Sequence, residues 1–132
     1  MKLNRIIETC IYSENLNESK IFYGDLLGLK LHSEVKNRHL FFRCGNNMFM
    51  IFNPKETLKT NLTVPTHGSI GPGHVAFAVQ ETELQKWRDY LESNGIPIEK
   101  QIDWPEGGES IYFRDPSNNS IEFTTSATWQ TK

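Results

Sequence analysis

The strongest constraint on the fold is an internal repeat with a period of about 70 residues. The run Phe41–Arg43 in the first half matches Tyr112–Arg114 in the second, and Gly28 matches Gly95. A repeat of this length indicates two copies of one small supersecondary unit, each too small to bury its apolar face alone. The fold must therefore be built from two similar halves that share one chain.

Each half predicts the same element order, strand, helix and three further strands. Apolar residues at helical spacing predict each helix, and short runs rich in β-branched and aromatic residues predict the strands. Module one spans residues 1–53, a connecting loop spans 54–72 and module two spans 73–126 of a single domain, 1–132. The fold class expected is α+β, with two paired βαβββ modules. The expected elements are strands 6–12, 29–33, 39–43 and 48–52 with helix 16–27, then strands 73–79, 96–102, 110–114 and 120–125 with helix 82–94.

Composition excludes several classes of function. The formal net charge is −2 and no basic stripe is visible, so we expect no nucleic-acid partner. No apolar run approaches the ~20 residues that span a bilayer, and the N-terminus lacks the apolar core of a signal peptide. We therefore expect a cytoplasmic protein without a membrane segment. Its two cysteines, Cys10 and Cys44, are expected to be free thiols.

Three ionisable residues occupy related places in the repeat. Sliding one half along the other brings Glu8 onto His74 and Met50 onto Glu122. Side chains alternate faces along a strand, so Glu8, His74 and Glu122 each fall on the more polar face of their strand. An unpaired Glu122 between Ile121 and Phe123 is costly to bury, and a metal or a partner charge would relieve that cost. From the residues alone, a shared metal site and separate solvated side chains both remain open.

The motifs resemble those of the vicinal oxygen chelate superfamily, which contains glyoxalase I, fosfomycin-resistance thiol transferases, bleomycin-resistance proteins and extradiol dioxygenases. The resemblance covers both halves and nearly the whole chain. It implies two βαβββ modules that curl a mixed sheet into a cup around a divalent metal. The residues that carry it are Asn15–Tyr23, Leu26–Leu29, Gly73–Phe77, Tyr112–Pro116 and Asn119–Glu122.

The family ligand positions, carried over to this chain, are Glu8, Met50, His74 and Glu122. Met50 departs from glyoxalase I, which resembles this layout but has a glutamate at that position. The implied site therefore holds one divalent ion through Glu8, His74 and Glu122 and leaves positions open for water and substrate. Two carboxylates and one imidazole suit Mn²⁺, Fe²⁺, Ni²⁺ or Mg²⁺, and Zn²⁺ is also compatible.

The resemblance also implies catalytic and substrate-binding residues. Glu122 or Glu8 would act as a base. An arginine in the cup would favour an anionic substrate, and a surface charge at a strand end is the alternative interpretation, which the residues favour slightly. A loop histidine would serve as an acid or base, or play no role. The candidate substrate-binding residues are His39, Arg43, Ser110, Tyr112, Arg114 and His67.

The function implied is a metal-dependent enzyme acting on a small oxygenated substrate, of the lyase, isomerase or ring-cleaving dioxygenase type. Two alternatives stand beside it: a fosfomycin-type thiol transferase, and a non-catalytic resistance protein that binds a small molecule. Small chains of this superfamily form homodimers, in which Glu8 would meet His74 and Glu122 across an interface. The sequence leaves open whether one chain or two chains supply the ligands.

Overall fold

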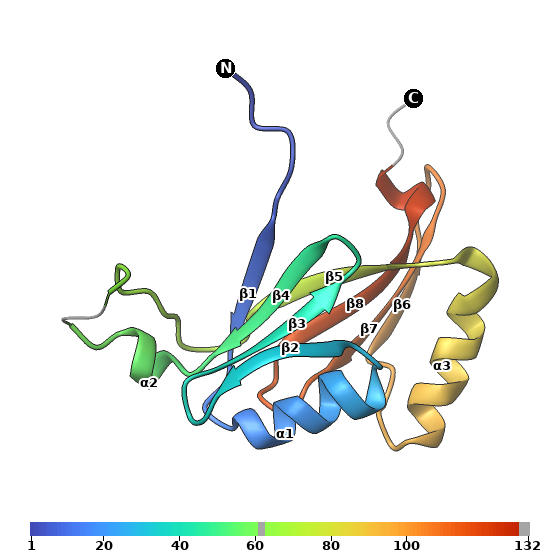
Figure 1. The fold of residues 1–132 in the computed structure, drawn as a ribbon. Helices are drawn as coiled ribbons and strands as arrows, with labels where there is room; N and C mark the ends of the chain where they lie inside the picture. The colour runs from blue at the N-terminus through green and yellow to red at the C-terminus, as the bar shows by residue number, and fades with distance from the viewer. Residues whose placement is uncertain (61–62, 130–132) are drawn as a thin grey trace. The chain divides into compact units, whose positions relative to one another are not determined.

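The computed structural model describes residues 1–60 and 63–129 and divides into two compact units, Met1–Gly71 and Pro72–Lys132 (Figure 1). Each unit contains one four-stranded mixed sheet and the element order βαβββ. The α+β class and the two βαβββ modules predicted from the sequence are therefore confirmed. The boundary at Gly71 assigns the connecting segment to the first unit.

In the first unit, a strand, a helix and three antiparallel-linked strands follow one another. Helix α1 (Leu16–Lys20) continues into a π-helical turn (Ile21–Leu26). The sheet order is β1-β4-β3-β2, with β1 parallel to β4. The strands are β1 (Glu8–Tyr12), β2 (Lys30–Val35), β3 (His39–Cys44) and β4 (Asn47–Phe52).

The second unit repeats this arrangement. A 3₁₀ turn (Glu81–Glu83) leads into helix α3 (Leu84–Ser93). The sheet order is β5-β8-β7-β6, with β5 parallel to β8. The strands are β5 (His74–Val79), β6 (Lys100–Asp103), β7 (Glu109–Arg114) and β8 (Ser120–Thr125), and a 3₁₀ turn (Ser126–Trp129) follows β8.

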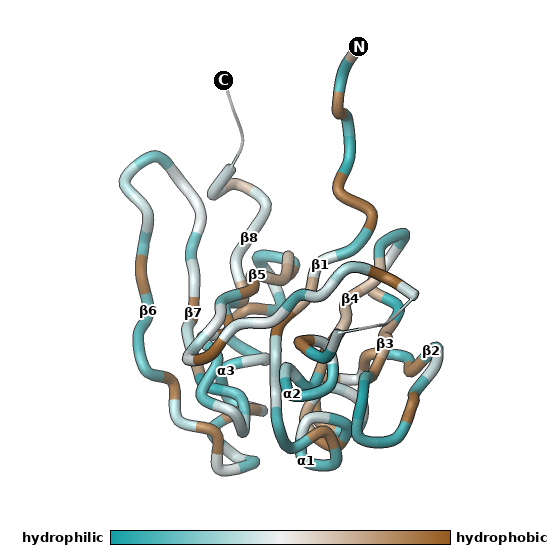
Figure 2. The backbone as a smooth tube through the Cα atoms, turned by 90° about the vertical axis from the view of Figure 1, so that its left-hand side faces the viewer, coloured by the Kyte–Doolittle hydropathy of each residue, from teal (hydrophilic) through white to brown (hydrophobic). Residues whose placement is uncertain are grey.

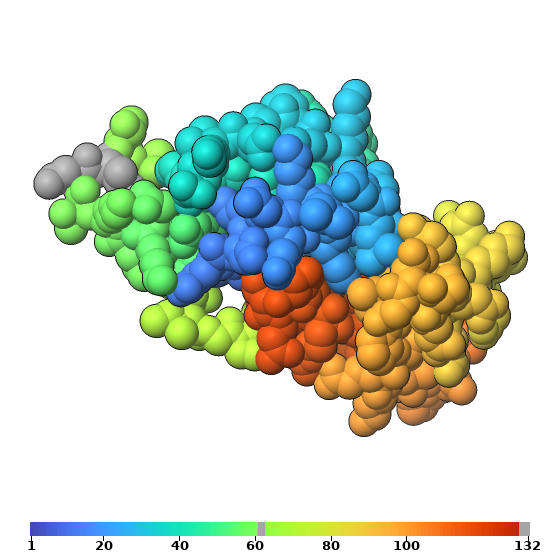
Figure 3. All heavy atoms as spheres, turned by 90° about the horizontal axis from the view of Figure 1, so that it is seen from below, coloured from blue at the N-terminus to red at the C-terminus, as the bar shows by residue number. Residues whose placement is uncertain are grey.

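One face of each sheet packs under the helix of the same unit. In the first unit the Tyr23 ring contacts Phe42 and Phe49. In the second, Trp87 of α3 packs edge-on against Phe123. The outer sides of α1 and α3 remain at the surface (Figure 3). Because side chains alternate along a strand, the opposite face of each sheet points away from that helix.

Strand register confirms the alignment of the two halves. Met50 of β4 lies opposite Cys10 of β1, and Glu122 of β8 lies opposite Ala76 of β5. Cys10 is two residues after Glu8, just as Ala76 is two residues after His74. Glu8 and His74 are thus equivalent in the two sheets, and Met50 and Glu122 are equivalent as well.

Several predicted boundaries were wrong for identifiable reasons. Strand β6 begins at Lys100 rather than at residue 96, because the Ile96 amide donates to Leu91 and closes α3, and Pro97 has no amide proton. The first strand begins at Glu8 rather than Ile6. The connecting loop is not wholly irregular, since Pro54–Thr57 forms helix α2 behind an Asn53 cap.

The two glycines that match in the repeat follow the ends of the helices. Gly28 and Gly95 both adopt φ of 77°, the left-handed conformation that commonly ends a helix. At the start of α1, the Asn15 side chain accepts a hydrogen bond from the Glu18 amide and caps the helix. The matching start in the second unit has no side-chain cap.

The N-terminal segment before β1 is extended and alternates between hydrophobic and hydrophilic residues (Figure 2). Its apolar residues, Leu3, Ile6 and Ile7, are exposed. Both cysteines are free thiols, as expected. Among the described residues, no helix has the length and apolar character needed to cross a bilayer.

Candidate metal centre

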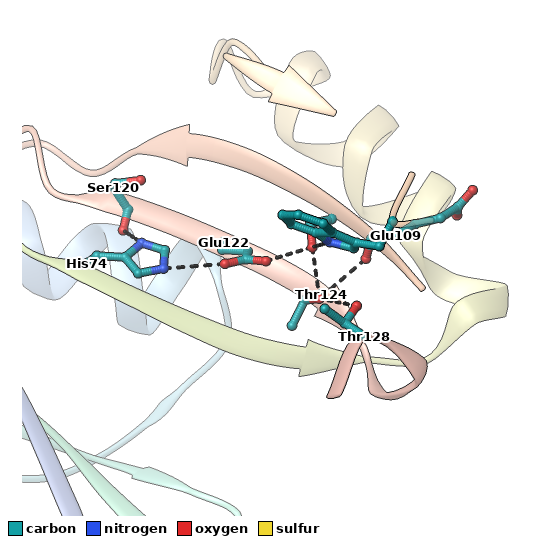
Figure 4. A network of polar contacts seen from close by, with 8 residues as sticks. His74, Glu109, Ser120, Glu122, Thr124 and Thr128 are labelled. Carbon is teal, nitrogen blue, oxygen red and sulfur yellow. Dashed lines mark hydrogen bonds and ion pairs between the residues drawn. The ribbon is translucent and has the colours of Figure 1, made fainter. Parts of the chain in front are cut away.

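His74 and Glu122 approach each other on the face of the second sheet that points away from α3 (Figure 4). His74 begins β5 and lies opposite Ser120 of β8, two residues before Glu122. The Nε2 atom of His74 lies 3.3 Å from Oε2 of Glu122. The Glu122 side chain is only 10% exposed, whereas that of His74 is 52% exposed. The pair therefore combines a nearly buried carboxylate with an imidazole that solvent and a ligand can reach.

The backbone determines which nitrogen of His74 carries a proton. Nδ1 lies 3.0 Å from the Ser120 carbonyl oxygen, which can only accept a hydrogen bond. Nδ1 is therefore the donor, and in the neutral ring Nε2 presents a lone pair. That lone pair faces a Glu122 oxygen, so the contact is favourable only when a cation, either a proton or a metal ion, lies there.

The same spacing fits a divalent ion. Adjacent donors on an octahedral ion with bonds of roughly 2.1 Å lie about 3 Å apart. The observed separation of 3.3 Å between Nε2 and Oε2 is close to that value. An Nδ1–H donated to a backbone carbonyl is also the usual support of a metal-binding histidine. His74 and Glu122 thus have the chemistry and the spacing of two neighbouring ligands.

Glu122 is oriented by a buried hydroxyl. Ser110 of β7 is fully buried, and its hydroxyl donates to Oε1 of Glu122 over 2.6 Å. The indole Nε1–H of Trp104 donates to Ser110 Oγ over 2.8 Å. Oε1 is therefore held by the protein, and Oε2 is left to face His74. Among the described residues, no buried side-chain nitrogen or oxygen lacks a hydrogen-bond partner.

A turn anchors the start of β5, where His74 lies. The Asp115 carboxylate accepts hydrogen bonds from the amides of Ser117 and Asn119 and from the Asn119 side chain. The Asn119 side-chain oxygen then accepts from the Gly73 amide over 2.7 Å. This explains why acidic and amide side chains occur in the turn after β7. They join the β7–β8 turn to the residue that precedes His74.

Tyr112 lies beside the pair. Its ring is stacked roughly parallel to that of His74, with centroids 6.4 Å apart. Burial raises the pKa of the Tyr112 phenol, and the hydrogen bond to Glu122 and the Glu122 charge raise it further, while a hydrogen bond with Ser110 opposes them. The phenol therefore stays protonated at neutral pH and can act as a hydrogen-bond donor.

Glu8, the third predicted ligand, lies at the start of β1 in the first unit and is exposed. The residues around it on the same strand face, Cys10 and Tyr12, are a thiol and a phenol. Within residues 1–60 and 63–129, no three His, Cys, Asp or Glu side chains gather closely enough to hold an ion. The second unit by itself therefore brings together two of the three predicted ligands, His74 and Glu122.

The other predicted site residues have different surroundings. Arg114 is engaged by Glu99, with both guanidinium contacts between 2.7 and 2.9 Å. Arg43 is exposed on β3. His39 is buried and stacked on Phe41, with ring centroids 3.9 Å apart. Burial and the Arg38 charge lower the pKa of the His39 imidazole, which favours its neutral form.

His67 is docked rather than mobile. Its Nδ1 lies 2.7 Å from the Tyr12 hydroxyl, and its ring packs edge-on against Phe52. Its backbone amide also donates to the Thr57 carbonyl. These contacts hold the connecting segment against the first sheet at this point.

Sequence reasoning missed the part that Thr124, Thr128 and Trp104 play in the Glu122 network. Thr124 Oγ1 lies 2.8 Å from Ser110 Oγ and 2.8 Å from Thr128 Oγ1. Strand alternation already places Thr124 on the same face as Glu122. Nothing in the pattern locates the Trp104 indole, because its position depends on how the β6–β7 hairpin folds back.

Comparisons with known proteins agree with this fold. A metallothiol transferase, FosB, from Staphylococcus epidermidis is 26% identical over 128 residues, covering 95% of this chain and 84% of the relative. A glutathione transferase, FosA, from Serratia marcescens is 32% identical over 108 residues, covering 82% and 71%.

A solved structure is closely similar as well. The crystal structure of a lactoylglutathione lyase from Agrobacterium tumefaciens superposes with a TM-score of 0.94 at 33% identity, covering 99% of this chain and 100% of that one. The family model for the Glyoxalase/Bleomycin resistance protein/Dioxygenase superfamily matches residues 3–123. The predicted resemblance is therefore confirmed, and the chain belongs to the Glyoxalase/Bleomycin resistance protein/Dioxygenase superfamily.

Proposed function

We propose that the chain is a divalent-metal-dependent enzyme that acts on a small oxygenated substrate, by lyase, isomerase or ring-cleaving dioxygenase chemistry. The main observation behind this proposal is the His74–Glu122 pair, in which the imidazole Nε2 and the carboxylate Oε2 lie 3.3 Å apart. His74 and Glu122 would hold the ion. Glu8, the register equivalent of His74, would supply the third ligand. The relatives named a metallothiol transferase and a lactoylglutathione lyase support the proposal.

The bound ion would supply Lewis-acid polarisation of a substrate oxygen. The protein's own groups would do the rest. Ser110 keeps Glu122 in one orientation, and Ser120 keeps the Nε2 lone pair of His74 available. Tyr112, whose phenol is hydrogen-bonded to Glu122 and whose pKa burial and Glu122 raise, would place its hydroxyl beside a substrate oxygen. Glu122 or Glu8 would accept a proton from the substrate.

The chemistry of the proposed ligands limits which metal ions the site would bind. Two carboxylates and one imidazole form an oxygen-rich site, which suits Mn²⁺, Fe²⁺, Ni²⁺ or Mg²⁺ and also admits Zn²⁺. The position equivalent to Glu122 in the first unit is Met50, a poor ligand for hard ions. Three protein ligands would therefore leave coordination positions for a substrate that binds through two oxygens.

A second candidate is a thiol transferase of the fosfomycin-resistance type. It is favoured by the curated relatives, which are named as thiol or glutathione transferases, and by Ser110 and Tyr112 beside Glu122. One observation opposes it. The Arg114 guanidinium, a candidate clamp for an anionic substrate, is engaged by Glu99. A non-catalytic binding protein is less well supported still, because such a protein has no need of an oriented His–Glu pair.

We further propose a homodimer. In that assembly Glu8 of one protomer would join His74 and Glu122 of its partner, as small members of the superfamily imply. A mixture of two inactive variants would test this directly. If ligands are shared across an interface, Glu8→Ala mixed with Glu122→Ala restores some intact sites. If one chain supplies all three, the mixture stays inactive.

An activity comparison distinguishes the candidates. Protein loaded with Mn²⁺ would be assayed for isomerisation of the methylglyoxal–glutathione hemithioacetal and, separately, for addition of a thiol to fosfomycin. We expect metal-dependent turnover of the oxygenated substrate that Glu122→Ala abolishes and that Ser126→Ala, at an exposed position after β8, leaves intact. Thiol addition alone would favour the second candidate. Absence of Mn²⁺ binding by the wild type would overturn both.

A further inference from the structure

The second unit contains a chain of hydrogen bonds that ends on Glu122 and begins outside the candidate metal centre. We propose that Trp104 is a positioning residue for Glu122, acting through the Ser110 hydroxyl, so that closure of the β6–β7 hairpin sets the metal affinity of the site. The inference rests on the proposed metal-dependent function. It assigns a role to a residue that touches neither the ion nor the substrate.

The donor and acceptor groups present determine the direction of these hydrogen bonds. An indole Nε1–H can only donate, so Ser110 accepts from Trp104 over 2.8 Å. A carboxylate can only accept, so the single hydroxyl proton of Ser110 goes to Glu122 over 2.6 Å. Each bond polarises the next, which strengthens the donation to Glu122. Removal of the Trp104 N–H therefore weakens the bond that holds Oε1.

The other contacts of Ser110 depend on where its proton lies. With that proton on Glu122, the 2.8 Å contact with Thr124 Oγ1 is a hydrogen bond when Thr124 donates, and the Glu109 carbonyl, 3.4 Å from the same oxygen, competes for the Thr124 proton. Thr124 Oγ1 also lies 2.8 Å from Thr128 Oγ1, and either hydroxyl can donate. Ser110 is fully buried, so rotation of its hydroxyl away from Glu122 would leave Oε1 without this donor in a place shielded from solvent.

The backbone holds Trp104 in place. Within the hairpin, the Trp104 amide donates to the Gly108 carbonyl and the Gly107 amide donates to the Trp104 carbonyl. Gly108 has φ of 88°, and an added Cβ there would overlap the backbone of Thr128. The hairpin therefore rests directly on the 3₁₀ turn after β8. Only glycine permits an approach this close at this backbone angle.

The consequence is a coupling between hairpin closure and ligand geometry. With the hairpin closed, Oε1 of Glu122 is occupied by Ser110, and Oε2 is directed toward His74. Without the indole donor, the hydrogen bond from the Ser110 hydroxyl to Glu122 is weaker, and the Glu122 carboxylate is held less firmly in its orientation. Loss of such an outer partner typically lowers metal affinity by about 10- to 100-fold.

The test compares two tryptophan variants. Each is titrated with Mn²⁺ alone, and electron paramagnetic resonance measures the concentration of unbound ion. Trp104→Phe removes the N–H and keeps an aromatic ring. Trp87→Phe is the matched control, because Trp87 is also half-buried in the second unit and packs against Phe123 and Tyr90. We expect Trp104→Phe to weaken Mn²⁺ binding by roughly tenfold or more at unchanged stoichiometry, and Trp87→Phe to bind like wild type. Equal affinities for Trp104→Phe and wild type would overturn the proposal.

A second readout needs no metal. Melting temperatures of the metal-free protein would be measured for Trp104→Phe, Ser110→Ala and the double variant. If Trp104 acts through Ser110, the double variant melts like Ser110→Ala alone. Additive losses would mean a purely structural tryptophan and would refute the positioning role. Should the wild type bind no Mn²⁺, the proposed function fails, and this cycle still decides whether Trp104 acts through Ser110.

Discussion

Met50 and Glu122 occupy the same register position in the two sheets, but only Glu122 can bind a hard metal ion. The residues paired with them on the adjacent strand differ as well. The apolar Phe41 lies opposite Met50, whereas Tyr112, which has a hydroxyl, lies opposite Glu122. Both changes in the first unit remove a polar atom. The repeated fold is thus retained, while only the second sheet carries a carboxylate at this register position.

The two helix-ending glycines provide a stability prediction based on the repeat. We expect Gly28→Ala and Gly95→Ala to lower the free energy of unfolding by similar amounts, about 1–2 kcal/mol each, because both have φ of 77° and an added Cβ meets no atom. Urea denaturation measures this. Gly24→Ala is the control, since its Cβ would make ordinary contact with Phe42. A loss at Gly24 as large as at the other two would contradict the conformational explanation.

These glycines belong to the part of the structure that the sequence predicts well. Both helices, the strand alternation and the equivalence of Glu8 with His74 follow from local patterns with fixed periods. The start of β6 was missed because Pro97 and the closing bond from Ile96 are tertiary details of one turn. The link from Trp104 to Ser110 was missed because it depends on the path of a hairpin, which no periodicity specifies.

Removal of the Ser110 hydroxyl should be costly. Ser110→Ala leaves a Glu122 oxygen and the Trp104 N–H without their partner in a buried place, which typically costs about 1–3 kcal/mol. Guanidinium chloride denaturation of the metal-free protein gives the value. Ser126→Ala, at an exposed position after β8, should change it little. An unchanged midpoint for Ser110→Ala would show that the network does not stabilise the fold.

The β7–β8 turn should affect the start of β5. Asn119→Ala removes the acceptor of the Gly73 amide, and we expect a loss of about 1–3 kcal/mol together with faster hydrogen exchange at Gly73. Amide exchange followed by nuclear magnetic resonance measures both effects. Asn118→Gly is the control, because Asn118 already has φ of 66° and glycine accepts that angle without strain. Unaltered exchange at Gly73 in Asn119→Ala would argue against the anchor.

The Tyr112 phenol should ionise at a higher pH than that of an ordinary tyrosine. Burial and Glu122 raise its pKa above the usual value of about 10, so the folded state binds the phenolic proton more tightly than the unfolded chain does. The stability contributed by this group is therefore fully present below pH ~10 and is lost as the pH rises through the folded pKa. Ultraviolet titration checks the shift. Glu122→Gln should return the pKa part of the way toward 10, since burial remains, and a pKa unaffected by this change would disprove the influence of Glu122.

Metal content tests the central claim most directly. The purified protein would be loaded with Mn²⁺, freed of excess ion and analysed by plasma mass spectrometry beside His74→Ala, Glu122→Ala, Glu8→Ala and the control Arg43→Ala. We predict about one ion per chain in the wild type and in Arg43→Ala, and loss of most of it in the three ligand variants, because each removes a proposed donor. Metal content that stays the same in His74→Ala and Glu122→Ala would contradict the metal centre.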